Sequence, residues 1–240
     1  MRYLEFATAS NFSFLRGASH AEELMVQAAQ LGLSGIGLCD RNSVAGVVRA
    51  HLAKREQNLS LRYHPGARLV FADGTPDVLA YPRDRAGWGR LCRLLTLGNL
   101  RAEKGGCILQ LDDLLAHAFG LELIAMSGNS TLLSRLRTAA PGRVRLAACM
   151  LYRGRDRARL ARSVALARGC QVPLIAVNDV LYHHPDRMWL ITPLMILWIS
   201  RVWLLASRGL LDEDPVIFAL KDRMSLLLGL GVALVAYSAL

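Results

Sequence analysis

The chain has 240 residues, a hydrophobic fraction of 53%, a mean hydropathy of +0.28 and a formal net charge of +10. The excess of positive charge precedes residue 188, where 25 basic residues stand against 15 acidic ones, and such a segment attracts anionic partners without identifying one. The five cysteines form no CxxC pair and the N-terminus has no long apolar run, so we expect neither a zinc ribbon, nor a disulfide-rich secreted scaffold, nor a signal peptide.

The first predicted helix covers residues 21–31, where apolar side chains recur at helical spacing. Ser19 precedes it and is available as its cap, because serine favours the position before a helix. Residues 34–39 then form a short apolar run bounded by polar residues, which suits a buried strand. This strand would deliver Asp40 at its carboxyl end.

A similar arrangement recurs further along the chain. Residues 155–168 predict an arginine-rich amphipathic helix, and residues 172–177 predict a strand that is followed by Asn178 and Asp179. The carboxyl ends of strands carry the chemistry in α/β proteins, so Asp40 and Asp179 are the candidate site residues. The alternative, that each carboxylate only caps a neighbouring helix or turn, stays open.

The character of the sequence changes after residue 187. Residues 188–206 contain a single charge and residues 224–240 contain none, and each segment approaches the length of about 20 residues that a bilayer span requires. We therefore expect a transmembrane helical hairpin with a polar loop at 207–223, which would place the chain at the membrane and its N-terminal part in the cytoplasm. The alternative is a buried pair of core helices.

Three blocks of sequence resemble the error-prone C-family DNA polymerases, in order and at suitable spacing. They are SNFSFLRGASHAEELMVQAAQLGLSGIGLCDRNSVAGVVRA (10–50), YPRDRAGWGRLCRLLTLG (81–98) and VNDVLYHHPDR (177–187). The resemblance implies that residues 1–187 form a PHP domain, the first domain of these cytoplasmic polymerases. The implied fold class is α/β, a distorted and incomplete PHP-type (β/α) barrel followed by the helical hairpin.

The resemblance also implies where a metal cluster lies in active PHP domains. The positions that correspond to its ligands hold other residue types in this chain, namely Ala7, Ala9, Arg16, Arg41, Arg68 and Leu181. Asp179 is the one matched position that keeps a ligand-type side chain, and a single carboxylate cannot seat two or three divalent cations. We therefore expect no metal, no cofactor, no catalytic residue and no metal-dependent nuclease activity.

The arginines suggest what replaced the metal cluster. Arg16, Arg41 and Arg68 would place fixed positive charge where the cations sat, and would pair with Asp40 and Asp179. This vestigial site would then be structural.

The tail carries a resemblance of its own. Its sequence ITPLMILWISRVWLLASRGLLDEDPVIFALKDRMSLLLG resembles the closing part of UbiA-type membrane prenyltransferases. The Asp-rich motifs that perform the chemistry of that family have no match in this chain. The resemblance of residues 188–240 therefore implies contact with the lipid bilayer without catalysis.

These observations favour the N-terminal PHP fragment of an error-prone DNA polymerase, a protein of DNA replication and repair that would be inactive by itself because the polymerase palm is missing. Its basic domain would contact DNA or polymerase-associated proteins. The alternatives are a membrane-tethered PHP phosphoesterase, a prenyltransferase-like membrane fragment, and a gene-fusion product with no evolved function.

Overall fold

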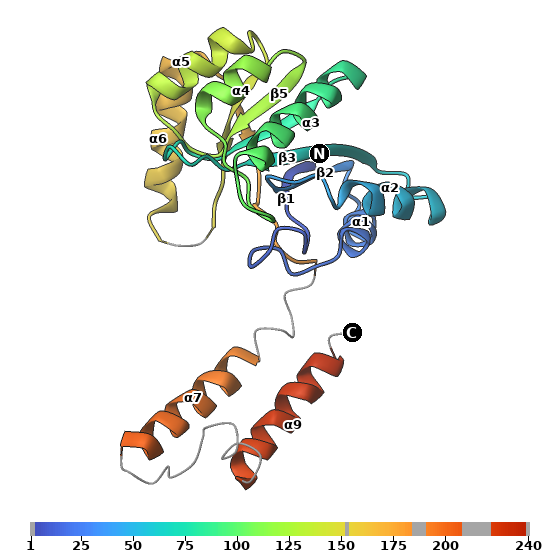
Figure 1. Cartoon of the computed structure of the whole chain (residues 1–240), viewed down its shortest axis with the longest axis vertical. Helices are drawn as coiled ribbons and strands as arrows, with labels where there is room; N and C mark the ends of the chain where they lie inside the picture. The colour runs from blue at the N-terminus through green and yellow to red at the C-terminus, as the bar shows by residue number, and fades with distance from the viewer. Residues whose placement is uncertain (1–2, 152–153, 184–190, 208–221, 239–240) are drawn as a thin grey trace. The chain divides into compact units, whose positions relative to one another are not determined.

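The chain divides into two compact units, Met1–His183 and His184–Leu240, in the computed structural model (Figure 1). The structure describes residues 3–151, 154–183, 191–207 and 222–238. The predicted domain boundary near Arg187 lies outside these described residues. Each unit is considered by itself below.

The first unit is built on a seven-stranded sheet whose strands follow one another in chain order. The strands are β1 (Leu4–Thr8), β2 (Gly35–Arg41), β3 (Arg62–Leu69), β4 (Val78–Pro82), β5 (Leu121–Ala125), β6 (Val144–Ala148) and β7 (Leu174–Ala176). β1, β2 and β3 pair in parallel, β4 is antiparallel to both of its neighbours, and β5, β6 and β7 are parallel again. Within this sheet, β4 therefore runs against the direction of the other six strands.

The two ends of the sheet approach each other. The segment after β7 forms a parallel bridge between Val180 and Thr8 of β1. The Val180 N–H donates to the Ala7 carbonyl at 2.7 Å, and the Ala9 N–H donates to the Val180 carbonyl at 2.9 Å. The α/β class and the PHP-type barrel are therefore confirmed, and the barrel expected to be incomplete is nearly closed.

Helices cover the outside of this sheet on two sides (Figure 1). They are α1 (Ala21–Gln30), α2 (Val47–Glu56), α3 (Arg85–Leu100), α4 (Leu111–His117), α5 (Ser130–Ala139) and α6 (Asp156–Gly169). α1 and α2 share one apolar cluster with β2, and α3 to α6 share a larger, leucine-rich cluster with β3 to β6. Burial of these apolar faces supplies most of the favourable free energy of folding.

The alternation of side chains along β4 shows how the sheet separates two cores. Val78 and Ala80 pack into the large helical cluster, whereas Leu79 and Tyr81 belong to a smaller cluster with β1, β2 and the segment after β7. Successive side chains of a strand point to opposite faces, so Tyr81 turns to the inside of the barrel. Gly66 makes room for the ring, because a Cβ at this position would lie 2.5 Å from Tyr81.

Both helices predicted before residue 188 are present, but the cap predicted for one of them is not. The helix predicted at 21–31 is α1, and the helix predicted at 155–168 is α6. The predicted Ser19 cap is wrong, because the helix begins after His20, whose N–H donates to the Glu23 carboxylate at 2.6 Å. The Ser19 hydroxyl instead accepts from the His183 N–H at 2.7 Å.

The second unit contains two described helices, α7 (Ile191–Ser207) and α9 (Arg223–Ser238). They pack against each other, and the guanidinium of Arg201 on α7 pairs with the carboxylate of Asp222, with 3.0 Å between Nη2 and Oδ1. Asp222 also accepts from the Ser225 N–H at 2.8 Å and so caps the start of α9.

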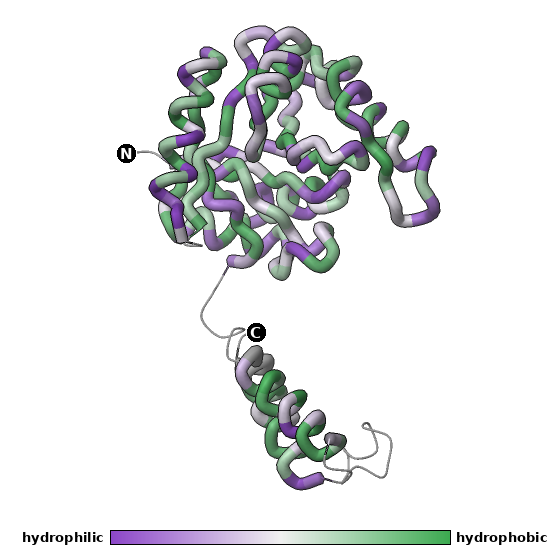
Figure 2. The backbone as a smooth tube through the Cα atoms, turned by 90° about the vertical axis from the view of Figure 1, so that its left-hand side faces the viewer, coloured by the Kyte–Doolittle hydropathy of each residue, from purple (hydrophilic) through white to green (hydrophobic). Residues whose placement is uncertain are grey.

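The apolar residues of this unit are largely exposed. Figure 2 shows hydrophobic residues along much of both helices, and Trp203 and Leu230 are 70% and 63% exposed. Among the described residues, no helix combines the length and apolar character that crossing a bilayer requires. The transmembrane hairpin predicted from 188–206 and 224–240 is therefore not supported, and parts of both segments and of the 207–223 loop lie outside the described residues.

Candidate functional site

The candidate site lies where the carboxyl ends of several strands meet. All strands except β4 run in one direction, so β1, β2, β3 and β7 end on the same side of the barrel. Asp40 lies near the end of β2, and Arg68 lies near the end of β3. The loop after β1 carries Arg16, and Asp179 follows β7. The fold thus brings together residues that are far apart in the sequence.

Asp40 is buried and is held by serines. Its carboxylate accepts from the Ser10 N–H at 2.8 Å, from the Ser10 hydroxyl at 2.8 Å and from the Ser13 hydroxyl at 2.8 Å. The residue is only 1% exposed, so these bonds compensate for the loss of water around the charge. Asp40 therefore fixes the loop that follows β1.

Asp179 is held by two arginines. The Arg16 Nη2 atom lies 2.9 Å from Oδ2 and 3.3 Å from Oδ1, and the Arg68 Nη1 atom lies 2.6 Å from Oδ1. Arg68 also donates through Nε to the Asp77 carboxylate at 2.6 Å. We call Arg16, Arg68, Asp77 and Asp179 the arginine–carboxylate cluster. It joins the loop after β1, the end of β3, the loop before β4 and the segment after β7.

The Arg68 side chain keeps its positive charge although it is buried. Its side chain is 7% exposed, and burial alone would lower the pKa of the guanidinium. The attraction of Asp179 and the bonds to Asp77 and Asp179 outweigh that effect, so the pKa is raised above its ordinary value. Arg68 is thus a permanent buried cation between two carboxylates.

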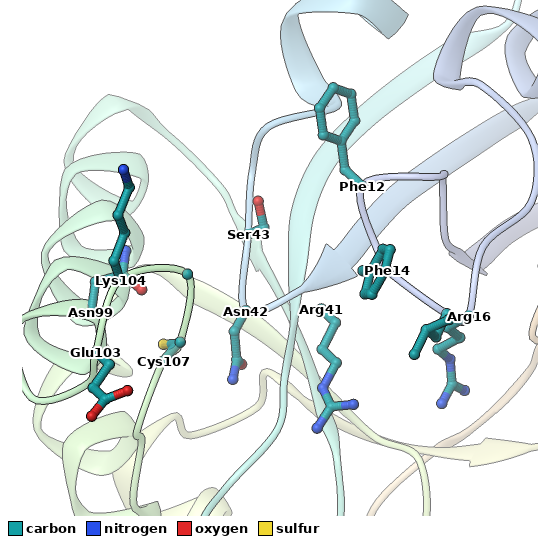
Figure 3. A pocket seen from close by; sticks show the side chains of 13 residues that line it. Phe12, Phe14, Arg16, Arg41, Asn42, Ser43, Asn99, Glu103, Lys104 and Cys107 are labelled. Atoms are coloured by element: carbon teal, nitrogen blue, oxygen red, sulfur yellow. The ribbon is translucent and has the colours of Figure 1, made fainter.

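Arg41 does not join the cluster, which corrects the hypothesis that it pairs with Asp40 or Asp179. It is exposed, and within the described parts of the chain it makes no ion pair. Its N–H donates to the Ser13 hydroxyl at 3.0 Å, while its guanidinium lines an open groove beside the site (Figure 3). Asp40 is satisfied by Ser10 and Ser13 instead.

The donor set does not suit a divalent cation. Searched over the described residues, the structure holds no group of three or more His, Cys, Asp or Glu side chains placed to bind one. Both oxygens of Asp179 are already bound by guanidinium groups, and a metal ion there would have to displace the buried Arg68. Ala7 and Ala9, both 1% exposed, offer no ligand atoms in their side chains.

The thiol beside the site is a weak nucleophile. Cys39 is buried next to Asp40, and burial raises the pKa of its thiol to about 12. The thiol stays protonated at neutral pH, and only the thiolate is a good nucleophile. Cys39 is therefore a poor nucleophile in this setting.

Sequence reasoning missed three partners of this site, Ser10, Ser13 and Asp77. The two serines lie three residues apart directly after β1, a spacing that lets both hydroxyls turn toward one acceptor, so a signal was present. Asp77 lies in a loop between β3 and β4, and nothing in its local sequence indicates that it meets Arg68.

The comparisons with known proteins agree with the fold of the first unit. The family model of the PHP domain matches residues 6–164. The chain is 50% identical over 194 residues to the error-prone DNA polymerase of Mesorhizobium japonicum, and 50% identical over 194 residues to that of Rhodopseudomonas palustris. Each match covers 77% of this chain, which spans only 17% and 18% of the length of these two relatives.

Two solved structures share the fold at 14% sequence identity. One, from Bifidobacterium adolescentis, is described as a metal-dependent phosphoesterase and has a TM-score of 0.57 over 76% of this chain and 88% of its own. The other, an amidohydrolase from Chromobacterium violaceum, has a TM-score of 0.51 over 75% of this chain and 87% of its own. The resemblance of the tail to UbiA-type prenyltransferases is not supported by these comparisons.

Proposed function

The chain belongs to the PHP domain family, and from this premise we propose that it is the PHP module of an error-prone DNA polymerase, with a structural site in place of a hydrolytic one. The similarity to curated error-prone polymerases over 194 residues supports the polymerase assignment. In this proposal the module belongs to DNA replication and repair, and no residue of it performs catalysis.

One observation carries the proposal of a structural site. The two oxygens of Asp179 are bound by Arg16 and Arg68, so the remaining ligand-type carboxylate faces guanidinium groups where a hydrolytic site needs cations. A guanidinium supplies fixed positive charge and a rigid set of donors, but it cannot activate water as a metal ion does.

The same bonds support a structural role for the site. Arg16 is 163 residues from Asp179 in the sequence, and Arg68 is 111 residues from it. The cluster therefore ties the beginning, the middle and the end of the barrel together at the side where its strands end. The segment after β7 joins β1 through a single bridge instead of a full ladder of hydrogen bonds. The ion pairs of the cluster supply additional contacts across this closure of the barrel.

A phosphodiesterase assay tests this function. The purified full chain is incubated with bis(p-nitrophenyl) phosphate and either Mn²⁺ or Zn²⁺, and we expect the same rate as in a reaction without protein, because no group activates water. The Asp179→Ala variant serves as the matched control. Hydrolysis that requires the metal, is abolished by EDTA and disappears in Asp179→Ala would contradict the proposal.

A further inference from the structure

We propose that the groove beside the arginine–carboxylate cluster binds single-stranded nucleic acid. The groove has a volume of about 910 Å³, within the range of roughly 300–1,000 Å³ typical of ligand sites. Figure 3 shows its two walls, one formed by the loop after β1 with Phe12, Phe14 and Arg16, the other by the end of α3 and the loop that follows it with Glu103 and Lys104. Arg41 lies between them.

An exposed aromatic ring is the first observation behind this inference. Phe14 is 81% exposed and Phe12 is 38% exposed, although both are large apolar side chains on the rim of a groove. The guanidinium of Arg49 lies 5.7 Å from the centroid of the Phe12 ring and covers part of it. Phe14 thus presents the more accessible surface, and an unpaired base can stack on such a ring whatever its identity.

The ring is carried by a loop that is held at both sides. Ser13 donates its hydroxyl to Asp40 at 2.8 Å, and Arg16 pairs with Asp179 at 2.9 Å. Two backbone bonds of 2.9 Å, from the Arg16 and Gly17 N–H groups to the Ser13 carbonyl, close the turn between them. A ring on an anchored turn loses less conformational entropy on binding than one on a free loop.

Unpaired positive charge is the second observation. Arg41 and Lys104 are both exposed, and neither makes an ion pair with any described residue. They flank the groove from different elements, as a chain of phosphates passing through it would require (Figure 3). The carboxylate of Glu103 is the acidic side chain of the lining, so the lining carries more positive than negative charge.

This combination favours a single strand over other partners. In a duplex the faces of the bases are stacked on one another and cannot pack on Phe14, whereas a single strand offers both bases and phosphates. The core of a protein–protein interface is depleted of charged residues, whereas this groove is lined by Arg41, Glu103 and Lys104. The inference goes beyond the proposed function, since it holds whether or not the neighbouring site hydrolyses anything.

Fluorescence anisotropy of a labelled oligo(dT) strand with the full chain tests the inference. We expect saturable binding at low salt that Phe14→Ala weakens about 10-fold, and Glu103→Gln should strengthen it because one repulsive charge is lost. Arg41→Ala combined with Lys104→Ala should reduce the slope of log affinity against log salt by about 1.4, since each phosphate contact to a single strand contributes about 0.7.

Phe119→Ala is the matched control. Phe119 is 66% exposed, but its ring lies under two guanidinium groups, those of Arg90 at 4.9 Å and Arg143 at 5.5 Å, and is outside the groove. This variant should bind the strand as the wild type does. The inference is wrong if Phe119→Ala and Phe14→Ala weaken binding equally, if a duplex of the same length binds as tightly, or if Phe14→Ala leaves strand binding unchanged. None of these outcomes alters the expected result of the phosphodiesterase assay.

Discussion

Replacement of Arg68 with alanine is expected to lower the free energy of unfolding by about 3 kcal/mol, because it leaves two carboxylates without their shared cation. The side chains of Arg68, Asp179 and Asp77 are 7%, 13% and 26% exposed, so water replaces the lost partner only in part. Asp179 would keep Arg16, whereas Asp77 would lose its ion-pair partner. Urea unfolding followed by circular dichroism measures the loss.

Two further variants test whether the loss of stability comes from the cluster or from the removal of any arginine. Arg41→Ala removes an exposed guanidinium from the neighbouring strand end and should change the stability by less than about 0.5 kcal/mol. Asp179→Ala combined with Arg68→Ala should cost less than the sum of the two single changes, because the residues interact directly. Equal losses for Arg68→Ala and Arg41→Ala would contradict the structural role of the cluster.

Replacement of Asp40 with alanine is the second change with a large expected effect, about 3 kcal/mol. The Ser10 N–H and the hydroxyls of Ser10 and Ser13 would be left buried without their acceptor, and each such group costs about 1–3 kcal/mol before the structure relaxes. The loop that carries Phe14 should also become mobile, which amide hydrogen exchange over residues 10–17 detects as faster exchange.

An exposed carboxylate supplies the control for this change. The Asp112 side chain is 79% exposed and pairs with Arg135 at the surface, so Asp112→Ala should cost no more than about 1 kcal/mol. If Asp40→Ala is equally mild and leaves exchange in the 10–17 loop unchanged, Asp40 does not hold that loop.

The positions of Asp40 and Asp179 could be predicted from the sequence because each follows an apolar run that forms a strand. Apolar runs of this length with β-branched residues determine a buried strand, and parallel strands bring their carboxyl ends together. Which arginine meets which carboxylate could not be predicted. Arg41 precedes a turn that directs it into the groove, whereas Arg68 on the neighbouring strand points to Asp179.

The fold, too, could be predicted from the sequence only in part. Periodicity located α1 and α6, but it carries no information on strand direction, so the antiparallel β4 could not be anticipated. For residues 188–240, composition alone was not enough to predict the structure. Long apolar segments favoured transmembrane helices, whereas α7 has 17 residues and α9 has 16, and a hydrophobic pattern alone does not distinguish a bilayer span from a shorter helix with exposed apolar faces.

We propose that guanidinium groups hold the place of catalytic cations around Asp179, and a metal titration tests this proposal most directly. The full chain is stripped with EDTA, dialysed, and titrated with Mn²⁺ and with Zn²⁺ in a calorimeter, and its metal content is measured by mass spectrometry. We predict that neither ion binds stoichiometrically at Asp179, because Arg16 and Arg68 already occupy its carboxylate. The wild type and Asp179→Ala should therefore give the same titration. Two or more tightly bound ions per chain, lost in Asp179→Ala, would contradict the claim.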